Sequence, residues 1–228
     1  MKRKLYFVLI LVLFIIFSSI TGYNFYIQYK NRPPKIIQAP KIVVTLPEGT
    51  NNEQMADILA SKLPLFNKQE FLNNKNNIQG YLFPDTYFFT ERTNTEEVSK
   101  TLNTTFNRKI KELQPSIDMS GKSLSDIIIM ASILEEEANG PKDIGVISGI
   151  LWKRMSIGIP LQVDVSPITY KEKGLPKLPL SNPGLLALQA SISSVASPYL
   201  YYLHDKSGQV YYARNYNEHR KNIKNYLK

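Results

Sequence analysis

Carboxylates are the groups in this sequence that are best able to do chemistry. Glu135, Glu136 and Glu137 stand together where a strongly apolar segment ends. The chain has no cysteine, which excludes thiolate nucleophiles and cysteine-based zinc sites. It also lacks a Gly-x-Ser-x-Gly elbow, a His-Glu-x-x-His pair and a phosphate-binding glycine loop, and neither histidine is near a plausible nucleophile in sequence. Acid–base chemistry by a carboxyl group is the class that remains.

Helical geometry narrows the choice among the three glutamates only in part. Successive residues point about 100° apart around a helix, so only one or two of the carboxyls can face a given cleft. Glu135 lies on a row with Ala131 and Ser132, whose small side chains leave room beside it. Partial burial there would raise its pKa and suit it to general acid catalysis near neutral pH. An exposed acidic helix end is the alternative that the residues alone leave open.

Two further segments offer groups that could bind a saccharide. Alternation over residues 158–164 predicts an extended strand with Gln162 and Asp164 on one face. A neighbouring amide and carboxylate suit sugar hydroxyls and acetamides. Tyr81, Phe83 and Tyr87 offer flat rings on which a sugar could stack, and core packing is the alternative for these rings.

The elements that must position these residues are predicted mainly from periodicity and capping. The segment 123–138 is apolar on every side, so it predicts a helix buried in the core, with Ser123 as its N-cap. Asn182 is expected to cap a helix that has Pro183 at its first position and runs to about residue 193. Helices are also predicted over 52–63, 95–113, 143–155 and from about 217, with a strand at 41–46 and a hairpin of 199–204 with 209–213. This mixture indicates an α+β fold.

The N-terminus predicts a membrane anchor. Lys2, Arg3 and Lys4 precede an apolar stretch, and the segment from Leu5 to Ile27 would span about 34 Å as a helix, enough to cross the hydrocarbon core. Basic residues before the span favour a cytoplasmic N-terminus, with the remainder outside. A cleaved signal peptide is the alternative, but residues 18–22 make a poor cleavage site.

Net charge indicates an affinity for polyanions. Lys+Arg number 28 against 19 Asp+Glu, a formal charge of +9. Nucleic acid, anionic lipid and anionic wall polymers are the general candidates. Nucleic acid is disfavoured as a partner because the basic residues lie beyond the expected anchor. Pro33, Pro34 and Pro40 predict an extended spacer over 31–41.

The order of several motifs resembles the YceG-like family, the endolytic murein transglycosylases. The resemblance covers about residues 42–228 and rests on the segments 45–50, 80–87, 131–135, 152–164, 174–176, 182–184 and 218–219. Gly80 to Tyr87 reads Gly-Tyr-Leu-Phe-Pro-Asp-Thr-Tyr as in the family, whereas Gln79 stands where Glu is usual. Residues 165–170 look like two family motifs fused, with the stretch between them missing. The chain therefore resembles a compact member.

The resemblance implies an architecture and a location. Residues 1–30 would be the cytoplasmic N-terminus and transmembrane anchor, 31–41 the spacer, 42–76 a small LysM-like module and 77–228 an α+β catalytic domain with a buried catalytic helix. The protein would cross the bacterial inner membrane once, with its catalytic domain outside the cytoplasm. Peptidoglycan glycan strands and the membrane are the implied partners, and a peptidoglycan synthase is a further candidate.

The resemblance also implies a mechanism. Glu135 falls on the family's catalytic glutamate, which protonates the glycosidic oxygen between MurNAc and GlcNAc. The same carboxylate then acts as base while the MurNAc 6-hydroxyl attacks the anomeric carbon, leaving a 1,6-anhydro end. One carboxylate can serve both steps, unlike the carboxylate pair of most glycosidases. Tyr81, Gln162, Asp164 and Asn182 are expected to bind or position substrate, and no cofactor or metal is implied.

Two other functions stay open at this point. A hydrolytic muramidase would need a second carboxylate near Glu135, and Asp164 is the candidate. A non-catalytic peptidoglycan-binding scaffold is the other alternative. Gln79 and the shortened segment 165–170 argue for the scaffold, and the presence of Glu135 argues against it.

Overall fold

A computed structural model describes residues 2–31, 40–138 and 140–227, without the side chains of residues 2–5 and 7–10. The chain divides into two compact units, residues 1–39 and 40–228. The first unit contains α1 (Lys2–Lys30), of which Leu11–Lys30 is long and apolar enough to cross a membrane. The expected apolar helix is thus present. Most of the spacer expected over 31–41 lies outside the described residues.

The second unit starts with a strand, two helices and a strand. They are β1 (Ile42–Thr45), α2 (Asn52–Lys62), α3 (Lys68–Asn73) and β2 (Thr86–Phe89), and the two strands pair antiparallel. Asn51 and Gln54 cap α2 reciprocally, which explains why this helix begins where the sequence indicated. The core of this part extends from β1 to Val98 and Leu102, so its packing continues past residue 76.

Helix α4 (Thr95–Ser120) connects this small core to a larger one. It starts at a capping box of Asn94 and Glu97 and ends at Gly121, which has φ +65°. The end expected at residue 113 was wrong, because α4 continues through Pro115. The lost backbone hydrogen bond is offset by the burial of Ile117 in the larger core.

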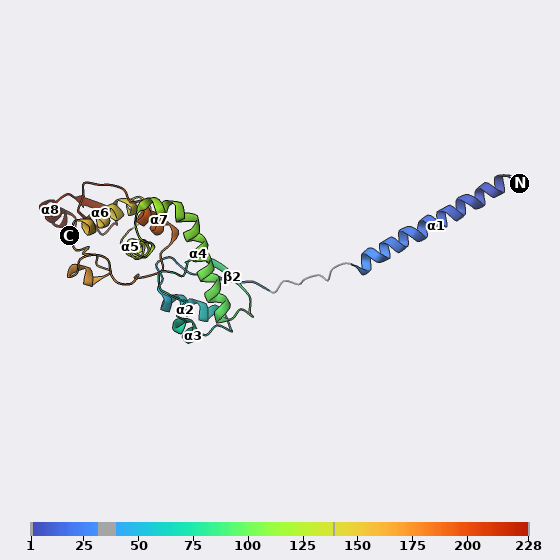
Figure 1. The fold of residues 1–228 in the computed structure, drawn as a ribbon, viewed down its shortest axis with the longest axis horizontal. Helices are drawn as coiled ribbons and strands as arrows, with labels where there is room; N and C mark the ends of the chain where they lie inside the picture. Colours follow the sequence, from blue (N-terminus) through green and yellow to red (C-terminus); the bar gives the residue numbers. More distant parts are fainter. Residues whose placement is uncertain (1, 32–39, 139, 228) are drawn as a thin grey trace. The chain divides into compact units, whose positions relative to one another are not determined.

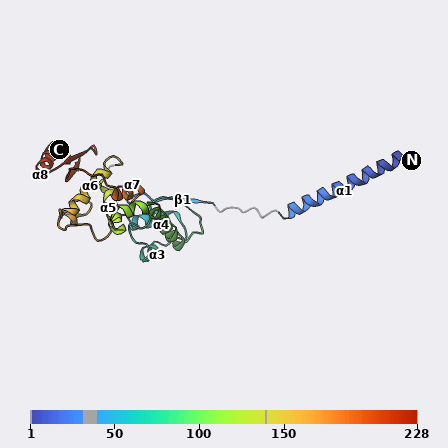
Figure 2. The ribbon, with the colours of Figure 1, turned by 45° about the horizontal axis from the view of Figure 1, so that its top comes forward.

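The larger core surrounds α5 (Leu124–Glu137), which packs against α6 (Ile144–Ser156) and α7 (Leu185–Ile192) (Figure 1). Ser123 caps α5, and residues 127–134 are all buried, which confirms the prediction of a helix enclosed on every side. Seen from another side, α7 also lies against α4 (Figure 2). The predicted cap of α7 was wrong: Gly184 is the N-cap, because the Asn182 side chain is engaged elsewhere.

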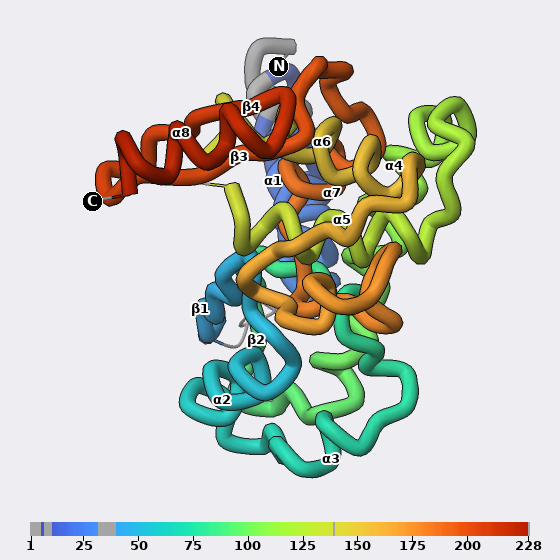
Figure 3. The backbone as a smooth tube through the Cα atoms, turned by 90° about the vertical axis from the view of Figure 1, so that its left-hand side faces the viewer, coloured from blue at the N-terminus to red at the C-terminus, as the bar shows by residue number. Residues whose placement is uncertain are grey.

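The C-terminal part is a hairpin covered by a helix. Strands β3 (Tyr201–His204) and β4 (Val210–Ala213) pair antiparallel, and α8 (Tyr216–Tyr226) lies along them (Figure 3). A short 3-10 helix, η1 (Pro167–Tyr170), precedes α7. The hairpin and the basic terminal helix confirm the sequence predictions, and the mixture of helices and small sheets confirms the α+β class.

Candidate active site

Glu135 lies at the C-terminal end of α5 and is half-buried. Its Oε2 accepts a hydrogen bond of 2.8 Å from the backbone N–H of Gly184. Burial raises the pKa of this carboxyl, and the nearby carboxylates of Glu48 and Glu136 raise it further, while the Gly184 hydrogen bond acts in the opposite direction. The last turn of α5 has no basic residue, and the negative end of a helix is also unfavourable for a carboxylate. The net effect of the surroundings is therefore to raise the pKa of Glu135.

The loop 179–184 brings the Gly184 amide to Glu135. Ser132 on α5 accepts the N–H of Leu180 at 2.9 Å. Gln79 donates from Nε2 to the carbonyls of Pro179 and Leu180, both at 2.9 Å. The space beside the small side chain of Ser132 is thus occupied by this loop. A glutamate at position 79 could not donate these two bonds, so Gln79 is adapted to its position here.

Asn182 is enclosed by three segments of the chain. It is 0% exposed, and its Oδ1 accepts the N–H groups of Gly80 at 2.8 Å and Leu82 at 3.2 Å. Its Nδ2 donates to the carbonyl of Thr50 and to Asn52 Oδ1, both at 3.0 Å. The segments 50–52, 80–82 and 179–184 together form a wall that supports Glu135. Asn182 lies inside this wall, with no face open to a substrate.

Gly80 is required where the loop 79–82 passes this wall. Its φ is +90°, which L side chains rarely adopt. A Cβ on Gly80 would also lie 2.6 Å from Pro179 Cγ and 2.8 Å from Ile128 Cγ2. The absence of a side chain lets Gly80 donate to Asn182 at close range.

Glu48 is a carboxylate beside Glu135 that sequence reasoning missed as a candidate. It belongs to the exposed turn after β1, and its carboxylate occupies the space that a Cβ on Gly184 would need. The next residue, Gly49, lies against Glu135 Cγ and donates its N–H to the Asn182 carbonyl at 3.1 Å. In the sequence, Glu48 is indicated only by the segment 45–50, one of those that carry the family resemblance. Glu48 is therefore a carboxylate near Glu135 that comes from a distant part of the sequence, in addition to the adjacent Glu136.

Glu137 faces a different environment. It lines a cavity of about 550 Å³ together with Gln162 and Asp164. Its Oε2 accepts the hydroxyl of Tyr202 at 2.8 Å. Burial raises the pKa of Glu137, and the Asp164 carboxylate adds to this. The structure thus groups the two predicted residues Gln162 and Asp164 with Glu137, and sequence reasoning did not single out this glutamate.

The segment carrying Gln162 and Asp164 is not the predicted strand. Leu161 and Val163 are buried while Gln162 and Asp164 are exposed, so the expected alternation is present. However, Gln162 has φ +52°, a left-handed conformation that is uncommon outside glycine. Its backbone N–H donates to the Thr169 carbonyl at 3.0 Å, so the chain turns back on itself here. A backbone held in this region at the edge of a cavity is typical of functional sites.

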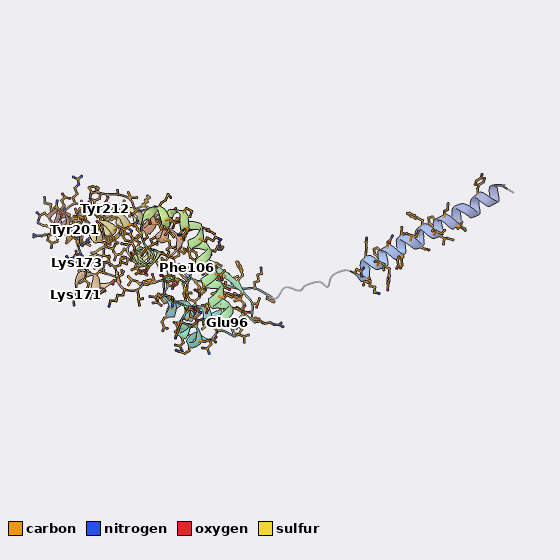
Figure 4. All side chains as sticks on the ribbon, in the orientation of Figure 1. Glu96, Phe106, Lys171, Lys173, Tyr201 and Tyr212 are labelled. Carbon is orange, nitrogen blue, oxygen red and sulfur yellow. The ribbon has the colours of Figure 1, made fainter. Side chains whose placement is uncertain are left out.

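The aromatic residues at the cavity are not the ones predicted. Phe83 and Tyr87 are buried in the cores, and the half-buried Tyr81 packs with its ring centroid 5.2 Å from that of Phe106. The cavity is instead lined by the tyrosines at positions 170, 201, 202 and 216. Tyr201 lies at the end of this unit where Lys171 and Lys173 are also found, and Glu96 lies at the opposite end (Figure 4). The hairpin was predicted, but nothing in the sequence indicated what it would face.

Comparisons with known proteins show the family to which the chain is similar. The model of the YceG-like family matches residues 24–168 and 168–225. An endolytic murein transglycosylase of Bacillus subtilis is 27% identical over 186 residues, covering 72% of this chain and 51% of the relative. One of Streptococcus pneumoniae is 25% identical over 174 residues, covering 64% of this chain and 32% of the relative. The chain therefore spans about half or less of the length of these relatives.

A solved structure shows the same fold. The crystal structure of a YceG-like protein of Listeria monocytogenes superposes with a TM-score of 0.72 at 25% identity. The match covers 81% of this chain and 76% of the other.

Proposed function

This chain belongs to the YceG-like family, and from that premise we propose that it is an endolytic lytic transglycosylase of peptidoglycan. The observation that carries the proposal is the Glu135 carboxyl, half-buried and held by the Gly184 N–H at 2.8 Å. The similarity to proteins named endolytic murein transglycosylase supports it.

Glu135 would act first as acid and then as base. The raised pKa suits Glu135 to donate a proton to the glycosidic oxygen between MurNAc and GlcNAc. After that transfer the carboxylate is stabilised by the Gly184 N–H and accepts the proton of the MurNAc 6-hydroxyl as this oxygen attacks the anomeric carbon. The C–O bond to the leaving sugar breaks, the new C–O bond closes the 1,6-anhydro ring, and Glu135 ends protonated as it began.

Other residues would support this step without taking part in it. Asn182 positions the loop that carries Gly184, since its amide joins Thr50, Asn52 and Gly80. Glu48 acts through Glu135 by keeping negative charge next to it. Gln162 and Asp164 are proposed to position substrate in the cavity beside Glu137.

The architecture we infer follows the family. Residues 1–30 serve as a single-pass anchor in the bacterial inner membrane, and the apolar helix of Leu11–Lys30 supports this. Residues 42–76 form the LysM-like module, supported by the order β1, α2 and α3, and residues 77–228 form the catalytic domain outside the cytoplasm. Nascent glycan strands are the proposed substrate, and a peptidoglycan synthase is a proposed partner.

The test is product analysis with the full chain in detergent. Wild-type protein should release fragments with 1,6-anhydro-MurNAc ends from purified glycan strands, read by mass spectrometry. Glu135→Gln keeps the shape of the side chain but removes the acid, so the products should disappear. Glu96→Gln, an exposed glutamate in the first turn of α4, is the matched control and should retain activity. A wild-type protein that binds glycan but yields no product would contradict the proposal and favour a scaffold.

A hydrolytic muramidase is the second candidate because Glu48 lies next to Glu135. Glu48 takes the place considered for Asp164 in the sequence, as the carboxylate that could activate water or act as nucleophile. Reducing MurNAc ends without anhydro ends would identify this chemistry, and Glu48→Gln would then abolish it.

A further inference from the structure

We propose that the cavity beside Glu137 binds the peptide substituent of the glycan, with a carboxylate of the peptide at Arg154 and an ammonium group at Glu137 and Asp164. This inference rests on the proposed function, since the peptide-bearing glycan of murein is the substrate that it names. It assigns to the cavity a ligand class different from the sugar that Glu135 acts on.

Arg154 supplies the first argument. Its side chain is only 4% exposed but lines the cavity, and its guanidinium lies over the Tyr201 ring at 5.2 Å. Nη2 donates to Gln162 Oε1, while Nε is buried without a hydrogen-bond partner. Within the described part of the chain Arg154 forms no ion pair. A buried guanidinium remains charged, so the missing partner is an anion, for which a carboxylate has the matching geometry.

The cavity also contains negative charge, on the carboxylates of Glu137 and Asp164. Glu137 accepts the Tyr202 hydroxyl, and Asp164 accepts the Tyr170 hydroxyl. In the described residues neither carboxyl pairs with a lysine or arginine. Glu137 also accepts a backbone hydrogen bond from Val165, and each carboxylate can accept more hydrogen bonds than these partners provide. An ammonium group carries three donors and would use this remaining capacity.

Together these groups select the class of ligand. A neutral sugar would leave both signs of charge unpaired in the cavity. An amine alone would leave the buried Arg154 guanidinium unpaired, which is costly, and an acid alone would leave the two carboxylates unpaired. A peptide that carries an ammonium and a carboxylate satisfies both, and the volume of about 550 Å³ is in the range of sites for small organic ligands.

The position of the cavity fits a branch of the same substrate. Glu135 and Glu137 are two residues apart on α5, so their side chains point about 200° apart around the end of the helix. A glycan at Glu135 can therefore direct a substituent past the end of α5 toward the cavity. Cleavage would then depend on the peptide as well as on the sugar.

Binding of soluble peptides to the full chain in detergent tests the proposal. The probe is an N-acetylated tripeptide with a free lysine side chain and a free C-terminal carboxylate, measured by calorimetry. Two matched probes have an acetylated lysine or a C-terminal amide. The charged peptide should bind, and removing either charge should weaken binding about tenfold or more.

Variants connect each charge to its residue. Asp164→Asn should remove the discrimination between free and acetylated lysine, and this exposed side chain can be changed without disturbing the core. Arg154→Met should remove the discrimination between acid and amide, and Arg154→Lys should preserve part of it. Arg108→Met, an exposed arginine paired with Glu112 on α4, is the control and should bind all probes as wild type does.

The outcomes separate this inference from the proposed function. Equal binding of all three probes, or displacement of the peptide by a peptide-free glycan disaccharide, would overturn the inference even if anhydro products form. Charge-dependent peptide binding in a protein that forms no anhydro products would leave the inference standing and overturn the proposed function. Glu135→Gln should bind the peptide normally, because its carboxyl faces Gly184.

Discussion

The two sides of the end of α5 differ in how they are built. On the Glu135 side, backbone groups of loops pack closely around the carboxyl, and the supporting Asn182 is fully buried. On the Glu137 side, side chains from the hairpin and from residues 154–170 surround an open volume of about 550 Å³. A closely packed wall can fix one proton donor, whereas a cavity lined by polar and charged side chains can accept a ligand. Glu135 and Glu137 lie only two residues apart on α5, yet their surroundings suit them to different tasks.

Substitutions on the two sides of α5 should affect glycan cleavage differently. Glu135→Gln should lower kcat for glycan cleavage about 10²- to 10⁴-fold, the usual contribution of a general acid. Glu137→Gln should act mainly on KM for peptide-bearing strands, because this carboxyl lines the cavity. Steady-state kinetics on the same strands measures both. A larger fall in kcat for Glu137→Gln than for Glu135→Gln would reverse the assignment of the two sides.

A second prediction concerns the stability of the wall. Asn182→Ala leaves the buried N–H groups of Gly80 and Leu82 without their acceptor, so the free energy of unfolding should fall by about 3 kcal/mol. Urea denaturation followed by circular dichroism measures this. Asn222→Ala, whose amide makes a single bond to the Tyr212 carbonyl near the surface, should cost less than half as much. Equal effects of the two changes would argue against a tightly constrained wall.

Gly184→Ala tests how Glu48 is placed. The backbone at Gly184 has φ −77°, so alanine is not strained there, but its Cβ would occupy the space of the Glu48 carboxylate. Glu48 should be displaced into solvent, and cleavage at neutral pH should fall by up to about tenfold, because the displaced carboxylate no longer raises the pKa of Glu135. Gly121→Ala is unsuitable as a control because of its positive φ, so Gly22→Ala in α1 is used. Unchanged kinetics in Gly184→Ala would show that Glu48 has no influence.

The smallest expected effect is a shift of the pH profile. Glu135 must be protonated to act as acid, so the rate falls as pH rises through its pKa. Glu48 and Glu136 both raise this pKa, and Glu48→Gln removes one of these contributions. The alkaline limb of the kcat/KM profile should move to lower pH, while the rate at acidic pH changes little. A shift to higher pH would contradict the electrostatic role of Glu48.

Much of the fold could be predicted because its signals are local. Capping boxes at Asn51 and Asn94 and the apolar sequence of α5 determine where helices begin and which one is buried. The predicted ends of helices were wrong where a distant contact outweighed a local preference. Pro115 did not end α4 because Ile117 is buried, and Asn182 did not cap α7 because its amide binds the loop at Gly80.

In the candidate site, too, local sequence signals determined one part and distant contacts determined the rest. The sequence by itself determined the acidic end of α5, and through the resemblance it selected Glu135 within it. Only the tertiary structure decided what surrounds each glutamate. The Gly184 N–H that holds Glu135 is 49 residues away in sequence, and the bond from Asn182 to Asn52 spans 130. Such contacts depend on how whole elements pack, and no periodicity or capping signal reports them. For that reason the separation of Glu135 from the cavity at Glu137 emerged only from the fold.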